Sequence, residues 1–446
     1  MSGLVVAYGE PDRSDLEAAF NKIRHRGPHI DGIYESQRVI MGQNYLEADG
    51  ATDQEEAQIP VISSVDTNLR ICYDGQMGNR EELAGTYGIS AGPFKEERLL
   101  LHLYQEHGRG MLQYLTDGIF ALVISNGEDL FAARDLLGIK TLYYGWKDKT
   151  LYLASELKSI FELTEEVYEF PPGHSMGPKG RLIRFTKLPS TPPGTLHTDL
   201  DRMIKDIRAI IRRSLGNRVD FRVPTGSLLS GGIDSSVITY LASEAYREKF
   251  GGNARLKTFA LGVGESSDIP NARVMATSIN TDHHELIVDP EEILKVLPEV
   301  IYYLESFDPP LVRSAVSNFL ISRYAREHGI QILLSGEGGD EIFCGYTYLK
   351  DFSADELFAR QMECIGFLHN NASLRLDRMN HCHSIRVVAP LISGELLDYS
   401  LAIPSEYKLK PEGDGKIGKW IFRKALARRD FTVFGSLLST SAQQMY

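Results

Sequence analysis

The sequence predicts an α/β protein of two domains, an antiparallel β sandwich with helices at residues 1–190 and a parallel-sheet domain at residues 191–446. Its 446 residues, 43% of them hydrophobic, suffice for two cores of ordinary size. Short apolar runs between turn signals fill the first part, which is typical of antiparallel sheets. Strand and helix patterns alternate in the second part, where two apolar strands end in glycine-rich turns, as in a parallel sheet.

The first domain is predicted from apolar runs such as residues 69–73, 120–124 and 142–144. Two stretches, 15–25 and 96–107, carry apolar residues at helical spacing instead. These features predict stacked sheets flanked by helices.

The domain boundary is predicted at residues 189–194, which read Pro-Ser-Thr-Pro-Pro-Gly. Such a run continues neither a helix nor a central strand. An amphipathic helix follows, with Leu200, Ile204, Ile207, Ile211 and Leu215 on one face. Strands and helices then alternate to about residue 346, and the remainder reads as mostly helical.

Composition excludes several classes of protein. A formal charge of −12, from 48 basic and 60 acidic side chains, disfavours nucleic acid as a partner. No apolar run is long enough to span a membrane, and residues 1–9 lack the pattern of a signal peptide. The four cysteines are scattered, which fits reduced thiols. We therefore expect a cytoplasmic protein that acts on small molecules.

The first glycine-rich turn lies in residues 228–236, Leu-Leu-Ser-Gly-Gly-Ile-Asp-Ser-Ser. Gly231 and Gly232 let the backbone approach a ligand, and Ser235 and Ser236 begin a helix whose free N–H groups favour an anion. Asp234 would repel a phosphate unless a divalent cation lay between them, so we expect Mg²⁺. The alternative is an ordinary strand-to-helix turn with a capping serine or aspartate.

The second turn lies in residues 332–341, Ile-Leu-Leu-Ser-Gly-Glu-Gly-Gly-Asp-Glu, and carries three carboxylates. The carboxyl ends of strands in a parallel sheet meet at one edge, where ligands of such folds bind. We therefore expect the two turns to face one site. Without a cation, their carboxylates would repel each other.

These motifs resemble those of the class B asparagine synthetases, whose loops read Ser-Gly-Gly-x-Asp-Ser-Ser and Ser-Gly-Glu-Gly-x-Asp-Glu. Further matches are Arg-His-Arg-Gly-Pro at 24–28, Arg-Asp-x-x-Gly-Ile-Lys at 134–140, Ala-Ser-Glu-x-Lys at 154–158, His-His-Glu at 283–285 and Leu-Asp-Arg-Met at 376–379. The resemblance implies an N-terminal glutaminase-type domain, similar to N-terminal nucleophile hydrolases. It also implies a C-terminal ATP-pyrophosphatase domain, similar to adenine nucleotide α-hydrolases. β-Lactam synthetases and lasso-peptide cyclases are related.

The resemblance also implies roles for single residues. Asp234 and Asp340 would hold Mg²⁺ and take part in catalysis, and Glu337 would orient or deprotonate the nitrogen nucleophile. Residues 259–262 would line the adenine. The residues expected to bind ATP are Leu229, Ser230, Gly231, Gly232, Asp234, Ser235, Ser236, Leu261, Ser335 and Gly336.

The glutaminase half departs from the family pattern. Ser2 replaces the nucleophilic cysteine, and the family's Asn-Gly-Glu reads Asp74-Gly75-Gln76. No arginine occurs near Gln43, where the family binds glutamine, and Lys95 replaces a carboxylate that would hold the substrate's ammonium. Burying the charges of glutamine without partners is costly. We therefore expect a degenerate glutaminase domain that serves as a scaffold.

The C-terminal part departs as well. Glu305, Asp308 and Arg313 match a segment that faces the acid substrate in the family, but the Arg-x-Lys motif, whose lysine touches pyrophosphate, is not found after residues 416–427. Lys416, Lys419 or Arg423 could replace that lysine. A simpler interpretation places all three on an amphipathic helix with their charges outward.

We therefore expect an ATP-dependent amide-forming ligase. A carboxylate would be activated as an acyl-adenylate, with release of pyrophosphate, and then attacked by ammonia or an amine, without glutamine. The alternatives are a non-catalytic or regulatory nucleotide-binding relative and a conventional asparagine synthetase. The expected partners are a small-molecule carboxylate and an amine, with no nucleic acid and no membrane. A homo-oligomer or a partner enzyme is compatible with the sequence.

Overall fold

The computed structural model describes residues 2–46, 61–62, 68–90, 92, 94–264, 266, 268–413 and 415–426. The chain forms two compact units. Unit 1 comprises Met1–Leu188, Tyr302–Phe307 and His369–Arg386, and unit 2 comprises Pro189–Ile301, Asp308–Leu368 and Val387–Tyr446. Two short segments that the sequence analysis assigned to the second domain thus belong to unit 1.

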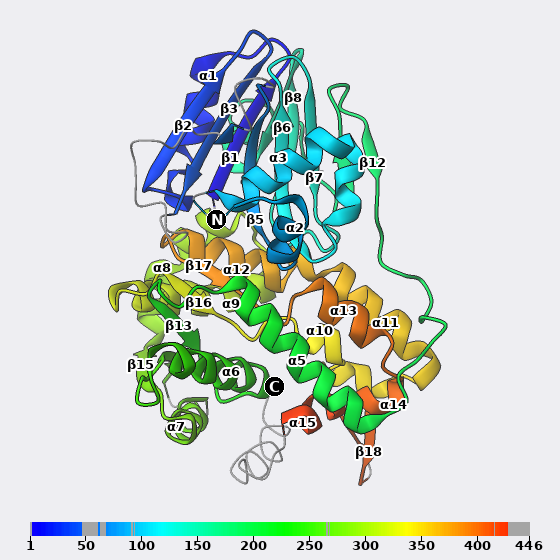
Figure 1. Cartoon of the computed structure of the whole chain (residues 1–446). Helices are drawn as coiled ribbons and strands as arrows, with labels where there is room; N and C mark the ends of the chain where they lie inside the picture. The colour runs from blue at the N-terminus through cyan, green and yellow to red at the C-terminus, as the bar shows by residue number, and fades with distance from the viewer. Residues whose placement is uncertain are drawn as a thin grey trace. The chain divides into compact units, whose positions relative to one another are not determined.

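Unit 1 contains two six-stranded sheets, whose strands pair antiparallel wherever a register is defined (Figure 1). The first has the order β10-β8-β9-β1-β3-β2 and the second β12-β11-β7-β6-β5-β4. The strands are β1 (Ser2–Tyr8), β2 (Ile30–Glu35), β3 (Val39–Tyr45), β4 (Val61–Ile62), β5 (Arg70–Met77), β6 (Gly118–Ser125), β7 (Leu130–Arg134), β8 (Tyr143–Lys147), β9 (Thr150–Ala154), β10 (Val167–Glu169), β11 (His174–Met176) and β12 (Leu182–Arg184).

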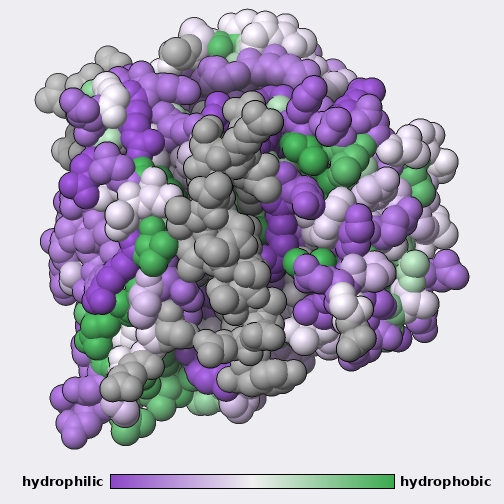
Figure 2. All heavy atoms as spheres, turned by 90° about the horizontal axis from the view of Figure 1, so that it is seen from below, coloured by the Kyte–Doolittle hydropathy of each residue, from purple (hydrophilic) through white to green (hydrophobic). Residues whose placement is uncertain are grey.

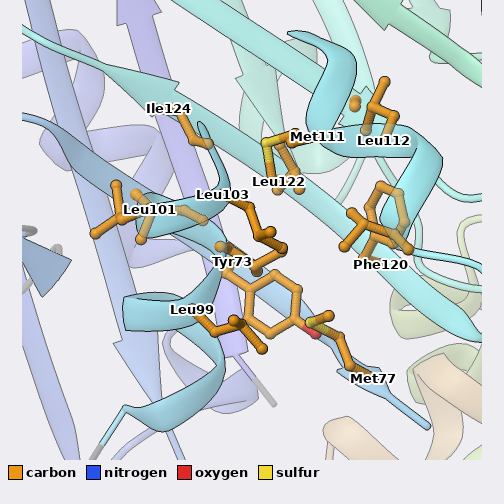
Figure 3. Close-up of a cluster of buried hydrophobic side chains, with 14 of the residues drawn as sticks. Tyr73, Met77, Leu99, Leu101, Leu103, Met111, Leu112, Phe120, Leu122 and Ile124 are labelled. Carbon is orange, nitrogen blue, oxygen red and sulfur yellow. The ribbon is translucent and has the colours of Figure 1, made fainter. Parts of the chain in front are cut away.

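The helices of unit 1 are α1 (Arg13–Asn21), η1 (Arg24–Arg26), α2 (Arg80–Tyr87), α3 (Lys95–His107), η3 (Gly108–Tyr114), α4 (Lys158–Phe161) and α12 (Ala372–His381). Helices α1 and α4 pack on the outer face of the first sheet, and α3 and η3 pack on the outer face of the second. Strand β1 shows the period of two that this layering requires, because Leu4 and Val6 pack between the sheets while Val5 and Ala7 pack against α1 and α4. On the other side, α3 and η3 bury leucines against β5 and β6 (Figure 3). The predicted sandwich is confirmed.

Unit 2 is built on a five-stranded sheet of order β15-β14-β13-β16-β17. Parallel pairs join β13 to β14, β14 to β15 and β13 to β16. Its strands are β13 (Thr225–Leu228), β14 (Lys257–Val263), β15 (Asp282–Val288), β16 (Ile332–Leu334) and β17 (Arg386–Val388), with a separate hairpin of β18 (Lys410–Glu412) and β19 (Gly415–Ile417). The predicted parallel-sheet domain is therefore confirmed.

Most of unit 2 outside the sheet is helical, as expected. The helices are α5 (Leu200–Arg218), α6 (Ile233–Phe250), α7 (Asp268–Ile279), α8 (Pro290–Leu304), α9 (Pro309–Glu327), α10 (Gly339–Phe343), η4 (Thr347–Asp351), α11 (Ala354–Gly366), η5 (Leu368–Asn370), α13 (Gly394–Leu401), α14 (Ser405–Lys408) and α15 (Trp420–Leu426). Of these, α8 continues into unit 1 from Tyr302, and η5 does so from His369. The amphipathic helix predicted after the boundary is α5, which buries Ile207, Ile211 and Leu215.

Among the described residues, no helix is both long and apolar enough to cross a bilayer. Figure 2 shows hydrophilic side chains over much of one face, with apolar side chains in small separate groups. Scattered apolar groups of this kind are normal on a folded protein.

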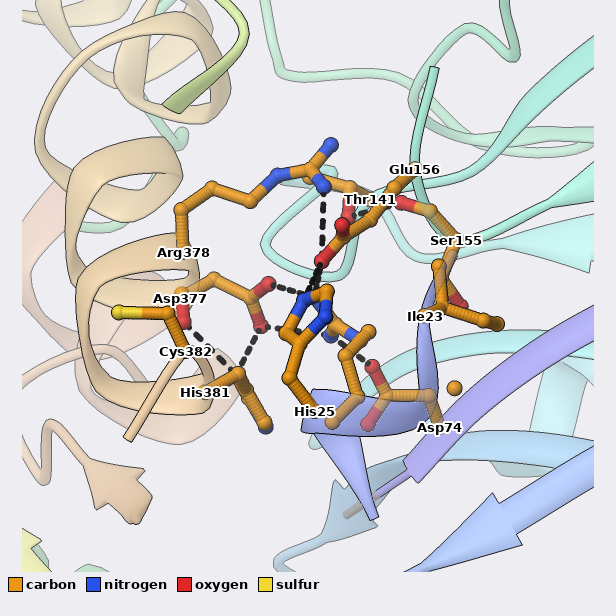
Figure 4. A network of polar contacts seen from close by, with 12 residues as sticks. Ile23, His25, Asp74, Thr141, Ser155, Glu156, Asp377, Arg378, His381 and Cys382 are labelled. Atoms are coloured by element: carbon orange, nitrogen blue, oxygen red, sulfur yellow. Dashed lines mark hydrogen bonds and ion pairs between the residues drawn. The ribbon is translucent and has the colours of Figure 1, made fainter. Parts of the chain in front are cut away.

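A buried cluster of charges explains why two late segments belong to unit 1 (Figure 4). Arg26 is fully buried and pairs with Asp74 at 2.9 Å, Asp377 at 2.8 Å and Glu156 at 3.0 Å. Lys140 pairs with Asp377 at 3.0 Å and with Asp74 at 3.2 Å. Helix α12 thus supplies a carboxylate that two cations of the sandwich share.

The second late segment is held in the same way. Glu305 forms ion pairs with Arg378 at 2.8 Å and with Lys158 at 3.1 Å. Arg378 also reaches Glu156, at 3.0 Å between Nη1 and Oε1. Burial alone would raise the pKa values of Asp377 and Glu156, but the surrounding cations outweigh it and hold both well below their usual range.

The cluster predicts a large stability effect for Asp377→Asn, which leaves Arg26 and Lys140 buried with less compensating charge. Breaking a buried pair from one side costs about 3–5 kcal/mol of unfolding free energy. The change is measured by urea denaturation in a Trp420→Phe background, where Trp146 of unit 1 is the remaining tryptophan. Glu10→Gln, which breaks an exposed pair with Lys149, is the control and should cost less than about 1 kcal/mol. Equal effects of the two substitutions would contradict this account.

Candidate active site

The first glycine-rich turn joins β13 to α6 at the carboxyl edge of the unit 2 sheet. Gly231 has a φ of +79°, and a Cβ there would lie 2.5 Å from the Cβ of Asn271. Only glycine fits this combination of left-handed backbone and close approach. The glycine therefore fixes the turn so that the N-terminus of α6 follows it directly.

Serine hydroxyls hold the shape of this turn. Ser235 Oγ accepts from Ser230 N at 3.2 Å and lies 3.0 Å from Ser230 Oγ. Ser236 Oγ, by contrast, is buried and has no hydrogen-bond partner among the described residues. Buried polar groups are normally satisfied, so an unsatisfied hydroxyl at a helix N-terminus fits a ligand oxygen.

The second turn, between β16 and α10, touches the first. A Cβ on Gly336 would lie 2.6 Å from the backbone nitrogen of Ser235, and one on Gly339 would collide with the Asp234 carboxylate. Ser335 is buried, and its Oγ accepts from Glu337 N at 3.3 Å. The structure thus brings the two turns to one place, as expected.

Strand β14 brings the predicted adenine segment to the same edge. Leu228, the last residue of β13, is in register with Phe259 of β14. Leu261 follows two residues later in β14, so it extends past the point where β13 ends. Leu229 donates its N–H to Phe259 O at 2.8 Å and is buried with Ala260. Leu261 itself is half-buried at the edge of the sheet.

Lys419 corrects the interpretation of the C-terminal lysines. Its ammonium contacts Asp234 and lies 2.8 Å from Asp340 Oδ1, with a side chain only 7% exposed. The charge of Lys419 therefore points inward and fills the space where the two carboxylates were expected to repel each other. Lys416 differs from the expectation as well, because its Nζ donates to Phe352 O at 2.7 Å.

The backbone around Lys419 is shaped to direct the side chain inward. Lys419 has a φ of +55°, which is uncommon for a residue with a side chain. A Cβ on Gly345 would collide with both Lys419 and Asp340, so the lysine crosses a position open only to glycine. Helix α15, which begins at the next residue, is anchored by Phe422, whose ring stacks on Phe343 of α10 with centroids 4.6 Å apart.

The electrostatics of this group are set by burial and mutual charge. Burial raises the pKa of Asp234 to about 6, with Lys419 opposing the shift and Asp340 adding to it. Burial would lower the pKa of Lys419, but the two carboxylates outweigh it and the pKa is raised. The lysine is therefore charged at neutral pH.

The donor set fits Mg²⁺. Two carboxylates face one point, and Asp234 Oδ1 is buried with no hydrogen-bond partner in the described part of the chain. Oxygen donors of this kind are what Mg²⁺ prefers. Asp234 and Asp340 would hold the cation, which would neutralise charge on phosphate oxygens.

Three expectations have other outcomes. The carboxylate of Glu305 is held in the ionic cluster of unit 1. Asp308 caps α9 by accepting from Leu311 N at 3.1 Å. Residues 427–446, at the end of the segment searched for the Arg-x-Lys motif, lie outside the described residues.

Ser2 lies at the start of β1 in unit 1 and is fully buried. Its hydroxyl donates to Tyr73 O and accepts from Gln43 Nε2 at 2.7 Å. Its backbone N–H donates to Asp74 Oδ1 at 3.2 Å. Lys95, at the position of the family's ammonium-binding carboxylate, pairs instead with Glu81 at 2.7 Å.

Comparisons with known proteins agree with this arrangement. A family model described as asparagine synthase matches residues 206–365 and 353–429, and a glutamine amidotransferase domain model matches residues 1–174. A probable glutamine-hydrolysing asparagine synthetase of Dictyostelium discoideum is 30% identical over 432 residues, covering 92% of this chain and 76% of that protein. Glutamine-hydrolysing asparagine synthetases of Zea mays and Oryza sativa subsp. japonica are 31% identical over 436 residues and 32% over 445 residues, with 94% and 95% of this chain and 72% and 73% of theirs covered.

Glu341, next to Asp340, predicts a pH dependence of stability. Its carboxylate is buried and accepts from Tyr346 Oη at 2.6 Å, and burial raises its pKa from 4.5 to about 7. An acid with a raised folded pKa contributes stability that is present below about pH 4.5 and lost as the pH rises through 7. Glu341→Gln keeps the hydrogen-bond acceptor but cannot ionise, so at pH 8 it should be more stable than the wild type by up to about 3 kcal/mol.

The measurement is urea denaturation from pH 5 to 8 in a Trp146→Phe background, where Trp420 reports on unit 2. The exposed Glu363→Gln is the control and should follow the wild-type profile. A Glu341→Gln curve parallel to that of the wild type would show that the carboxyl is not perturbed.

Proposed function

The chain belongs to the asparagine synthetase family, and from that premise we propose that it forms an amide with nitrogen taken from ammonia or another amine rather than from glutamine. As a member of this family it is an ATP-dependent carbon–nitrogen ligase that produces AMP and pyrophosphate. The acid is a small carboxylate, and aspartate is the first candidate because asparagine is its amide.

The observation that supports the ligase chemistry best is the meeting of Asp234 and Asp340 at the N-terminus of α6. One oxygen of the substrate carboxylate would attack the α-phosphorus of ATP, and pyrophosphate would leave. Ser236 Oγ and the N–H groups that follow Gly232 would donate hydrogen bonds to phosphate oxygens, because they lie at the positive end of a helix. The two carboxylates would hold the Mg²⁺ that accompanies the nucleotide.

The second step needs a nitrogen nucleophile that has lost a proton. Glu337 lies in the turn that touches Asp234, so its carboxylate is a candidate to orient the amine or accept its proton. Attack of the amine on the acyl carbon would form the amide and release AMP. Leu261, in β14 at the same edge of the sheet, would contact the adenine.

Independence from glutamine is supported by the surroundings of Ser2. The serine hydroxyl donates its hydrogen bond to the carbonyl oxygen of Tyr73, which cannot serve as a general base. Asp74 lies beside it, with Oδ1 3.2 Å from Ser2 N. A carboxylate at this place would repel the oxyanion that forms when an amide is attacked, whereas amide hydrolysis needs hydrogen-bond donors there.

The charge balance of the cluster around Asp74 supports the same conclusion. Its four acids, Asp74, Glu156, Glu305 and Asp377, face four bases, Arg26, Lys140, Lys158 and Arg378. Burial lowers the pKa of the adjacent His381, so its imidazole adds no charge at neutral pH. Because these acids and bases are paired with one another inside the cluster, they are not available to bind the ammonium and carboxylate of glutamine.

Ligase activity predicts that Asp234→Asn lowers turnover by on the order of a hundredfold or more, about 3 kcal/mol of transition-state stabilisation. Turnover is measured as AMP and pyrophosphate formed from ATP with aspartate and other candidate acids in the presence of ammonia. The control is Asp355→Asn, an exposed acid in the first turn of α11, which should act like the wild type. Equal rates for Asp234→Asn and wild type, or no pyrophosphate with any acid, would favour a non-catalytic nucleotide-binding relative.

If the nitrogen comes from ammonia or an amine rather than from glutamine, Ser2→Ala should leave ammonia-dependent turnover unchanged. Ser2→Cys alone should not produce glutamate from glutamine, because Asp74 would still oppose the oxyanion. Both are measured by amino-acid analysis of reactions that contain glutamine or ammonium. Glutamate formed by the wild type at the rate of ligation, and lost in Ser2→Ala, would instead identify a conventional glutamine-hydrolysing asparagine synthetase.

A further inference from the structure

The position of Lys419 raises the question of how a divalent cation reaches the two carboxylates. The ammonium is 2.8 Å from Asp340 Oδ1 and also contacts Asp234. Mg²⁺ binds carboxylate oxygens at about 2.0–2.1 Å and demands near-octahedral geometry. An ammonium has no lone pair and cannot be a ligand, so Lys419 and the metal cannot both occupy the space between these carboxylates.

We propose that Lys419 is an exchangeable cation: it neutralises Asp234 and Asp340 in the nucleotide-free protein and leaves them when a divalent cation arrives together with the phosphates of ATP. This inference rests on the proposed use of Mg²⁺ and ATP at this site. It makes Lys419 a positioning residue that keeps the empty site intact.

The first support is the charge of the site. Without Lys419, Asp234 and Asp340, whose side chains are 18% and 38% exposed, would face each other, and each would raise the free energy of the other's charged form. Removing the ammonium from them is likewise unfavourable unless it finds another anion, since a buried unpaired charge is costly. The phosphates of a nucleotide supply that anion, whereas a free metal ion does not.

The second support is the path of the side chain. Lys419 reaches the carboxylates across Gly345, where any Cβ would collide with it, and Gly418 precedes it. Because α15 is anchored by Phe422, the side chain can change partner while the helix stays in place. The φ of +55° is strain at the junction between Gly418 and α15, and strain of this kind is common at switching positions.

The exchange predicts a specific pattern of metal binding. A divalent cation alone must displace Lys419 without compensation and should bind weakly to the wild type. In Lys419→Met nothing has to be displaced, so the cation alone should bind at least tenfold more tightly. A nucleotide should then strengthen metal binding much more in the wild type than in the variant.

The experiment uses Mn²⁺ as the probe, with free Mn²⁺ counted by electron paramagnetic resonance. The full-length wild type, Lys419→Met and Lys416→Met are titrated without nucleotide and then with α,β-methylene-ATP, which is not cleaved at the α-phosphate. Lys416→Met is the matched control, because Lys416 bonds only to the backbone carbonyl of Phe352 in the described contacts and should bind Mn²⁺ like the wild type. Wild type and Lys419→Met binding Mn²⁺ alone with equal affinity would overturn the proposal.

Folding of the variant is controlled by a second substitution. In Lys419→Gln the amide can still donate a hydrogen bond to a carboxylate, which helps to keep the fold while the charge is removed. This variant should bind Mn²⁺ alone at least tenfold more tightly than the wild type. Equal Mn²⁺ affinity of a folded Lys419→Gln would also overturn the exchange. The titration needs no acid, amine or turnover, so it remains valid if the ligase proposal fails. Conversely, if wild type and variants bind Mn²⁺ with equal affinity, the exchange is wrong even when the enzyme forms AMP normally.

Discussion

Neutralisation of buried charge is the constraint on which both units depend. In unit 2, Asp234 and Asp340 meet at the carboxyl edge of the sheet. The ammonium of Lys419 pairs with both carboxylates and offsets their mutual repulsion. In unit 1, Arg26 is buried among three carboxylates, two of them on the sandwich and the third on α12. Charges removed from water need partners where they lie, and this need decides which segments come together. Glycines at positions 231, 336 and 345 give the backbone the space that these approaches require.

Both units pair their buried charges, but the pairing has a different consequence in each. The charges of unit 1 neutralise one another, and Ser2 and Asp74 take part in that arrangement, in a unit that matches the glutamine amidotransferase domain model. The charges of unit 2 are arranged around a cation that a ligand can replace. Ser236 Oγ and Asp234 Oδ1, both buried and without partners among the described residues, mark the difference, because unsatisfied groups are retained where a ligand satisfies them.

Local patterns predicted much of this molecule from its sequence. Helical spacing at residues 96–107 identified α3, and the apolar strands that end in glycine turns identified β13 and β16 with their shared edge. Lys419 was misread because its partner is 185 residues away, and a lysine beside an amphipathic helix has the same local pattern whether its charge points in or out. The assignment of residues 302–307 and 369–386 to unit 1 depends on ion pairs such as Arg26 with Asp377, which no periodicity encodes. Gly418 before Lys419 was the one local hint of an unusual backbone.

We propose that this chain activates a carboxylate at the α-phosphate of ATP, at the site where Asp234 and Asp340 meet. Transfer of isotope tests it most directly. When the acid carries ¹⁸O in its carboxylate and ammonia is the only nitrogen source, one ¹⁸O should appear in AMP and none in pyrophosphate, as mass spectrometry of the products would show. AMP without ¹⁸O, or ADP as the nucleotide product, would contradict the claim.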